Sequence, residues 1–259
     1  MSQVITLLSD WHLRDPYVAM LKGELLKALP DAHILDITHY VDKFNLLQTA
    51  LLMRNSYASF PEGSIHLMLT NMSLNSSFPL VLFSHNGHHF IGEDNGVFHL
   101  MFGQEMALKG LQLSDDKENT LAQILHWIQL LSTDSLDGDH TKEYLQFKRM
   151  FMQQPENVTE NQRIEGQIVY IDAFNNAVTD IPVKMFRQVV QNRPFTATIQ
   201  SKGIWKITKH YPEYSSLESE MYLCDNSLGL LEVVSYQSDV AILADLEVGD
   251  KIFIQYGEL

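Results

Sequence analysis

Three short stretches of the chain combine carboxylate and amide side chains directly after predicted β-strands: Ser9-Asp10, Asp94-Asn95-Gly96 and Asp172-Ala173-Phe174-Asn175-Asn176. A carboxylate can hold a cation or accept hydroxyl hydrogens, and an amide both donates and accepts, so it can read the edge of a heterocycle. Strand tips are where rigid folds place ligand contacts. The same residue types also form ordinary turns and caps, so a turn at Asp172 and a cap at Asp10 remain the alternative interpretations.

Asp10 has the most favourable place of these acids, because it follows the first predicted strand. In an open parallel sheet, ligands gather outside the carboxyl ends of the strands. An aspartate at such an end can accept two hydrogen bonds from a ribose diol. The position therefore indicates a candidate nucleoside contact.

The pattern of the first part of the chain positions these acids on a parallel α/β sheet. Strand-like runs alternate with helical periodicity, which is typical of that class. We expect strands at 4–8, 33–37, 65–69 and 97–102, a hairpin of 80–84 with 89–91 around Asn86-Gly87, and helices at 17–29, 45–59, 119–131 and 142–152. The sequence thus predicts an α/β domain over 1–152 with a mostly parallel sheet.

Beyond a polar stretch at 153–163, which we interpret as a linker, the pattern changes to short strands separated by polar turns. The expected strands are 168–171, 195–199, 204–206, 221–224, 230–234 and 251–255. Such spacing is typical of a barrel or sandwich. The second domain, 164–259, is therefore predicted to be smaller, all-β and barrel-like.

Charge and composition narrow the classes of function. The chain of 259 residues has 18 Lys and Arg against 32 Asp and Glu, a net charge of -14, which argues against nucleic-acid binding and against attraction to anionic membranes. No apolar run is long enough to span a bilayer, and the N-terminus lacks the basic region of a signal peptide. The single cysteine, Cys224, fits a cytoplasmic protein and a buried structural thiol.

Other chemistries find little support. The chain has no phosphate-binding glycine loop and no Gly-x-Ser-x-Gly elbow. His66, His85, His88 and His89 raise the alternative of a zinc site, but adjacent His88 and His89 face opposite sides of a strand, and their spacing matches no metal motif. We therefore predict no metal.

The segments that carry chemistry also resemble those of one family. They are Ile5 to Asp10 with Asp15-Pro16-Tyr17-Val18 and Lys22-Gly23, Ile34 to His39, Phe60 to His66, Asp94-Asn95-Gly96, Tyr170 to Asn176, and Asn226 to Glu232. In this order they resemble the S-adenosylmethionine (SAM) hydroxide adenosyltransferases, relatives of the SAM-dependent fluorinases and chlorinases. The resemblance covers nearly the whole chain.

The resemblance implies an α/β domain, a β-barrel-like domain and a homotrimer whose ligand lies between neighbouring subunits. In the family, water or a halide attacks C5′ of the adenosyl group and methionine leaves, without a metal or organic cofactor. The resemblance assigns substrate contacts as follows: Asp10 to the ribose diol, Phe44 beside the ribose, Asp172 to the methionine amine, Phe174 to the ligand, Asn176 to the adenine edge and Ser227 to the methionine carboxylate.

The chain departs from the family where the family activates water. Asn71 stands where the family has an aspartate, no arginine follows it, and the region 116–128 lacks the family's His-Gly-Arg-Asp segment. Asn175 stands where the family has a glycine, a change that is tolerable because asparagine can adopt left-handed backbone angles. Asp180 stands where the family has an asparagine.

Two functions therefore stay open. One is hydrolysis of SAM to adenosine and methionine, with Asn71 as the weak candidate for positioning water. The other is a catalytically degenerate paralogue that binds an adenosyl ligand. Halide chemistry is a lesser alternative, for which Ser73, Ser76 and Ser77 would supply hydroxyl groups.

Overall fold

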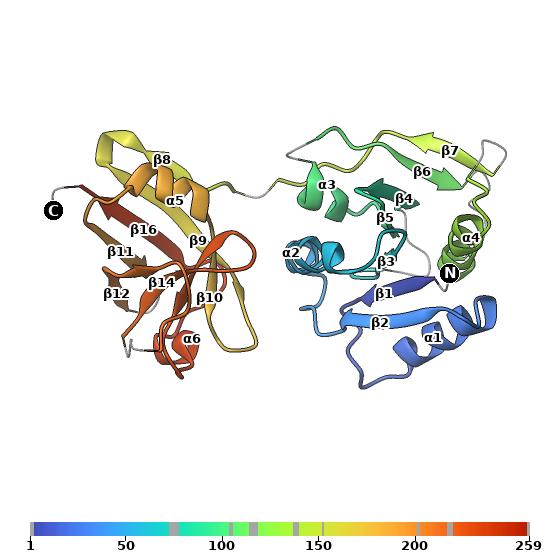
Figure 1. The fold of residues 1–259 in the computed structure, drawn as a ribbon, viewed down its shortest axis with the longest axis horizontal. Helices are drawn as coiled ribbons and strands as arrows, with labels where there is room; N and C mark the ends of the chain where they lie inside the picture. Colours follow the sequence, from blue (N-terminus) through green and yellow to red (C-terminus); the bar gives the residue numbers. More distant parts are fainter. Residues whose placement is uncertain are drawn as a thin grey trace. The chain divides into compact units, whose positions relative to one another are not determined.

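A computed structural model of the chain describes residues 3–72, 78–103, 106–113, 119–136, 140–151, 153–200, 203–216 and 220–257. The chain divides into two compact units, unit 1 (Met1–Met152) and unit 2 (Gln153–Leu259) (Figure 1). Each unit has its own sheet and its own hydrophobic core.

Unit 1 is built on a seven-stranded mixed sheet with the order β2-β1-β3-β5-β4-β6-β7. The half from β2 to β5 is parallel and the half from β5 to β7 is antiparallel. The expected α/β class is confirmed. Asp10 and Asn71 follow two strands of the parallel half, β1 and β3. The strands are β1 (Val4–Leu8), β2 (His33–Thr38), β3 (Ile65–Met68), β4 (Leu80–His85), β5 (His88–Glu93), β6 (Gly110–Leu113) and β7 (Thr141–Tyr144).

Helices cover both faces of this sheet because alternate strand residues point to opposite sides. On one face, α2 (Leu46–Ser56) and α3 (Val97–Phe102) share a cluster with Leu8, Met68 and Phe90. On the other, α1 (Tyr17–Ala28) and α4 (Thr120–Ser132) share one with Ile5, Leu7 and Leu67. Asparagine side chains start α2 and α4 by accepting backbone N–H groups, Asn45 from Gln48 and Asn119 from Ala122. A 3-10 turn, η1 (Tyr57–Ser59), follows α2.

Two sequence-based predictions in unit 1 are wrong. Residues 97–102 form the helix α3 instead of a strand; all six side chains are buried, and a short apolar run without periodicity fits either structure. The helix expected at 142–152 is absent from its described part, 142–151, because Thr141–Tyr144 pairs with β6 and residues 145–151 have no regular secondary structure. Leu145, Met150 and Phe151 are exposed, so the buried helical face that the pattern suggested does not exist.

Unit 2 is a curled, half-barrel sheet with three short helices, so the predicted barrel-like β fold is confirmed as a mostly β unit, although not as an all-β one. Its path is β12-β11-β16-β9-β10-β15-β14-β13, with β8 paired to β9. The strands are β8 (Glu156–Val158), β9 (Arg163–Ile171), β10 (Ala177–Pro182), β11 (Phe195–Gln200), β12 (Ile204–Ile207), β13 (His210–Tyr211), β14 (Tyr222–Asp225), β15 (Leu230–Val234) and β16 (Lys251–Tyr256). Short helices, η2 (Thr159–Asn161), α5 (Val183–Val190) and α6 (Val240–Leu243), complete the unit.

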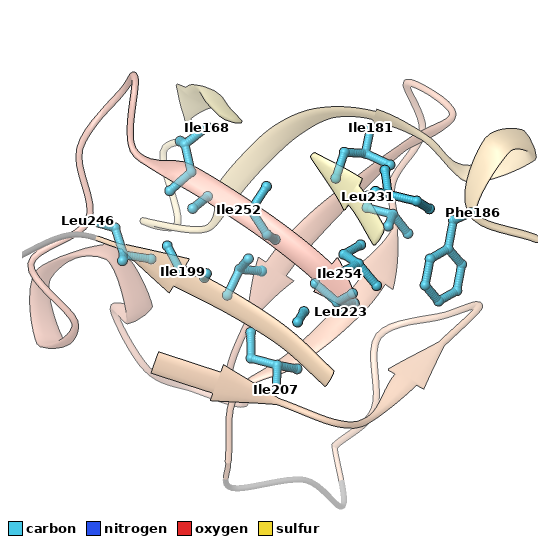
Figure 2. Packing of buried hydrophobic residues seen from close by; sticks show 14 of the residues in the cluster. Ile168, Ile181, Phe186, Ile199, Ile207, Leu223, Leu231, Leu246, Ile252 and Ile254 are labelled. Carbon is cyan, nitrogen blue, oxygen red and sulfur yellow. The ribbon is translucent and has the colours of Figure 1, made fainter. Parts of the chain in front are cut away.

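The core of unit 2 fills the concave side of this sheet. Figure 2 shows side chains from β9, β10, β15 and β16 converging there with Phe186 of α5. Gly166 in β9 allows the close approach of β10, because a Cβ atom at that position would lie 2.5 Å from Oδ1 of Asp180. That carboxylate accepts the N–H of Gln167, and burial raises its pKa. Across the described ranges of both units, no helix has the length and apolar character needed to cross a bilayer.

The histidines of β3 and β5 make the stability of unit 1 depend on pH. Burial, together with the neighbouring His88 and His89, lowers the pKa of His66 from 6.5 to about 3. The folded unit therefore keeps His66 neutral, whereas the unfolded chain takes up a proton near pH 6.5. The free energy of unfolding therefore has its full value above about pH 6.5. It falls as the pH drops toward 3, by up to about 1.4 kcal/mol per pH unit for this one group.

Urea unfolding between about pH 7.5 and pH 4.5 measures this effect. A Trp205→Phe background confines the fluorescence signal to Trp11 and Trp127 of unit 1. We expect His66→Asn, which keeps an acceptor for the Thr6 hydroxyl, to flatten the decline of the free energy of unfolding toward acid pH. His33→Gln, at an exposed site, should keep the original decline. An unchanged slope in His66→Asn would contradict the prediction.

Candidate functional site

The carboxylate of Asp10 joins three segments at the carboxyl edge of the parallel strands. It follows β1, and its Oδ2 accepts the backbone N–H of Phe44 at 2.9 Å and that of Asn71 at 3.2 Å. Phe44 lies after β2 and Asn71 after β3, so one oxygen fixes two neighbouring loops. Oδ1 makes no hydrogen bond to any residue of the described ranges. Asp10 is therefore anchored through Oδ2 alone among the described residues.

Both backbone partners of Asp10 have left-handed backbone angles. Phe44 has φ 65° and Asn71 has φ 56°. Asparagine tolerates this region, whereas a bulky residue pays roughly 1–2 kcal/mol for it. The hydrogen bond to Asp10 helps to hold the backbone of Phe44 in this conformation. The Phe44 side chain is 68% exposed. The ring of Phe44 is thus free to contact a ligand.

A second set of polar contacts holds Thr70, the residue before Asn71. Asn95 donates its amide Nδ2–H to the carbonyl of Thr70 at 3.2 Å, and the Thr49 hydroxyl donates to Oγ1 of Thr70 at 2.8 Å. The predicted cluster Asp94-Asn95-Gly96 therefore lies at the same sheet edge and contacts the segment that follows β3. The side chain of Asn71 makes no hydrogen bond within the described ranges.

Asp94 itself bonds to β7 and to the segment that follows it. Its Oδ2 accepts the Tyr144 hydroxyl and the backbone N–H of Lys148, both at 2.7 Å. Burial raises the pKa of Asp94, although the Tyr144 and Lys148 hydrogen bonds oppose that shift. We therefore regard Asp94 as a buried anchor of the segment after β7. Ser73, Ser76 and Ser77, the candidates for halide contacts, lie outside the described residues.

The histidines that suggested zinc contact each other instead. Nε2 of His66 lies 3.1 Å from Nδ1 of His88, and Nδ1 of His66 lies 2.7 Å from the Thr6 hydroxyl. His89 contacts the Ser84 hydroxyl. Within the ranges that the structure describes, no group of three or more His, Cys, Asp or Glu side chains is arranged to hold a metal ion.

In unit 2, Asp172 and Asn176 form one tightly bonded turn between β9 and β10. Oδ1 of Asp172 accepts the backbone N–H groups of Phe174 and Asn176, both at 2.8 Å, and Oδ2 accepts Nδ2–H of Asn176 at 3.1 Å. Asn175 has φ 57°, as expected from its replacement of a glycine. Phe174 is 77% exposed at the tip. The turn interpretation of these residues holds, and within the described ranges Oδ1 and one Nδ2–H of Asn176 have no hydrogen-bond partner.

Ser227 lies in a different turn, between β14 and β15. Asn226 shapes this turn by accepting the N–H groups of Leu228 and Leu230. Its neighbour Gly229 accepts the N–H of Val183, just after β10, whereas Asp172 and Asn176 lie before β10. In strand register the two turns flank opposite ends of β10, but a register shift shortens their separation, because Val178 pairs with Glu232 and Pro182 with Leu230, only two residues apart in β15. Within the described residues, no hydrogen bond joins Ser227 to Asp172.

Glu232 of β15 lies between these turns and was missed by sequence reasoning. It pairs with Val178 of β10, and its carboxylate interacts with Asn226 and with the charge of Asp172. Burial raises the pKa of Glu232, with a further contribution from Asp172. Only the strand pairing reveals this contact, since the sequence pattern of β15 marks no such role. Cys224 is buried, and burial raises its pKa to about 11, in accord with an inert structural thiol.

The chain matches models of both domains of one family. The SAM hydroxide adenosyltransferase N-terminal domain matches residues 5–131 and the C-terminal domain matches residues 166–253. The chain is 23% identical over 268 residues to an (R)-S-adenosyl-L-methionine hydrolase of Methanocaldococcus jannaschii, covering 98% of this chain and 96% of that protein. A hydrolase of the same description from Thermus thermophilus is 25% identical over 120 residues, 46% of this chain and 47% of that protein.

Solved structures show the same fold. An uncharacterized conserved protein from Thermotoga maritima superposes with a TM-score of 0.80 at 21% identity, covering 97% of this chain and 99% of its own. A conserved hypothetical protein from Thermus thermophilus gives a TM-score of 0.69 at 20% identity, covering 99% and 100%. Because both domain models match in order and together span most of the sequence, the chain belongs to the SAM hydroxide adenosyltransferase family.

Proposed function

We propose that this protein binds the adenosyl group of SAM and hydrolyses the compound to adenosine and methionine. The observation that carries the proposal is the Asp10 carboxylate, whose Oδ2 is held by two backbone N–H groups while Oδ1, which has no hydrogen-bond partner among the described residues, would accept a ribose hydroxyl. Membership of the family and the description of the relatives as SAM hydrolases support SAM as the substrate.

The reaction needs little covalent help from the protein. The oxygen of water attacks C5′, the C5′–S bond breaks with its electron pair going to sulfur, and a water proton is released. The sulfonium is already a good leaving group, so the protein mainly has to exclude bulk water and align the nucleophile with the C–S bond. No step requires a metal or an organic cofactor.

The other candidate contacts are proposed from the same assignment. Phe44 and Phe174 offer exposed rings to the ligand. Asn176 would read the adenine edge with its remaining N–H and Oδ1, and Asp172 would attract the methionine ammonium. Ser227, which is exposed, would bind the methionine carboxylate.

A second candidate function is adenosyl binding without turnover. Asn71 favours it, because an amide cannot take the proton of water, and loss of a general base commonly costs about 100- to 10,000-fold in rate. Asn71 has a left-handed backbone, which asparagine adopts more easily than most residues. An asparagine at this position therefore has a conformational explanation that does not involve catalysis.

We also propose a homotrimer, on the family resemblance. Sedimentation equilibrium should then give a mass of three times the chain mass of 29.7 kDa. A monomer at micromolar concentration would contradict this part of the proposal.

Incubation of the protein with SAM in ¹⁸O-labelled water tests the hydrolysis. We expect equal amounts of adenosine and methionine above a control without protein, with the label in the 5′ hydroxyl of adenosine, because water oxygen bonds to C5′. If no adenosine forms but calorimetry detects adenosine binding, the binder is supported. If neither SAM nor adenosine raises the melting temperature at millimolar concentration, both functions fail.

Replacing Asp10 tests the ribose contact. We expect Asp10→Asn to weaken adenosine binding about 10- to 100-fold, because a charge-assisted hydrogen bond is lost, while its amide oxygen can still accept the two loop N–H groups. Calorimetry with 2′,3′-dideoxyadenosine should show little change, since that ligand lacks the 2′ and 3′ hydroxyls that Asp10 would bind. Asp31→Asn, at an exposed turn, is the charge-matched control. An equal loss for both nucleosides would refute the assignment.

Replacing Asp172 separates amine recognition from turn structure. Asp172→Asn keeps an acceptor for the N–H groups of Phe174 and Asn176 but removes the charge. We expect SAM affinity to fall about tenfold or more while adenosine affinity changes less, because only SAM carries the ammonium. Glu213→Gln, exposed in the same unit, should behave as the unaltered protein. Parallel losses for both ligands would assign Asp172 to the turn alone.

A further inference from the structure

Behind Asp10 runs a chain of buried polar contacts that begins at Ser9. The Ser9 hydroxyl lies 2.7 Å from Nδ1 of His39, and neither side chain has more than 2% of its surface exposed. Nε2 of His39 lies 3.0 Å from Oδ1 of Asp36, without the geometry of a linear hydrogen bond. Oδ2 of Asp36 accepts Nζ–H of Lys22 at 2.6 Å. The chain thus leads from the half-exposed Asp36–Lys22 pair to the residue next to Asp10.

The charge of Asp36 sets the direction of these contacts. Burial alone would raise the pKa of Asp36, but Lys22 and His39 outweigh it and lower the pKa below its ordinary value. The Asp36 carboxylate beside Nε2 favours a proton on that nitrogen, which leaves Nδ1 to accept the Ser9 hydroxyl hydrogen. The Ser9 oxygen then accepts the backbone N–H of Trp11 at 3.3 Å.

His39 also holds the Asp10 loop through its backbone. Its carbonyl accepts the N–H of His12 at 2.8 Å, and Ser9 donates its N–H to the carbonyl of Thr38 at 3.0 Å. The residues on both sides of Asp10 are therefore fixed by contacts that start at Ser9 and His39. The Asp10 carboxylate in turn fixes Phe44 and Asn71.

The order serine, histidine, carboxylate is also that of the serine hydrolases. Nucleophilic attack by Ser9 is excluded here by burial, because the side chain has no exposed surface and its oxygen faces the N–H of Trp11. The arrangement can orient a loop but cannot reach a substrate.

We propose that His39 is a positioning residue for the ligand contact of Asp10: it orients the Ser9 hydroxyl and, through it, the backbone from Ser9 to His12. This inference rests on the proposed binding of a nucleoside at Asp10. In the proposed site His39 touches no ligand, and its effect is transmitted through Ser9 and the loop.

Two substitutions at His39 separate its two nitrogens. His39→Asn places an amide oxygen near the position of Nδ1 and can still accept the Ser9 hydroxyl, whereas His39→Gln retains a donor toward Asp36 and loses that acceptor. We expect Ser9→Ala and His39→Gln to weaken adenosine binding about five- to twentyfold, with His39→Asn closer to the unaltered protein. Affinity for 2′,3′-dideoxyadenosine should stay the same, because Asp10 acts on the ribose hydroxyls.

Calorimetry well below the melting temperature of each variant provides the test, and Ser84→Ala is the matched control. That variant removes another serine hydroxyl from a histidine, His89, at 2.9 Å in the same unit. Asp36→Asn, at a half-exposed site, serves if a buried variant does not fold, and it should lower the ratio of adenosine to dideoxyadenosine affinity about two- to threefold.

The inference is overturned if these variants lower the melting temperature but leave the affinity ratio of the two nucleosides unchanged, since a purely structural role predicts that result. It is also overturned if Ser84→Ala lowers the ratio equally. Failure of the unaltered protein to bind adenosine or SAM would instead refute the proposed function itself, so the two failures are distinguishable.

Discussion

The hydrogen bonds to Oδ2 of Asp10 are the interaction on which the candidate site of unit 1 depends. Parallel strands bring the segments after β1, β2 and β3 to one edge of the sheet, and the Asp10 carboxylate joins them. Two of the joined residues, Phe44 and Asn71, have left-handed backbones that need such support. These contacts use Oδ2, and Oδ1 makes no hydrogen bond to the described residues. Loop stability and the proposed ligand recognition thus depend on the same side chain.

Unit 2 uses a carboxylate in a similar way, at the tip of an antiparallel hairpin. Asp172 accepts three hydrogen bonds from the turn it begins, and these hold Asn176 in a defined orientation. Glu232 brings a second acid toward this turn from β15. A partly buried pair of like charges is costly unless a cation or a proton compensates, which is consistent with the proposed ammonium contact.

Sequence reasoning succeeded where the signal was local and failed where packing decided. The β4–β5 hairpin followed from Asn86-Gly87, and helix α1 from its apolar spacing. The segment Val97–Phe102 is apolar on every side, so periodicity could not separate a buried helix from a strand. Residues 141–144 became a strand because β6 offered an open edge, a partner that their own sequence does not encode.

The sequence by itself determined the two fold classes, the acids at the strand ends and the resemblance to the family, because periodicity, turn chemistry and short motifs depend on near neighbours. Only the tertiary structure decided which oxygen of Asp10 is occupied, that Ser227 and Asp172 flank opposite ends of β10, and that His39 supports Ser9. These contacts join residues as far apart as 61 positions, and strand register and packing, which involve the whole chain, bring them together.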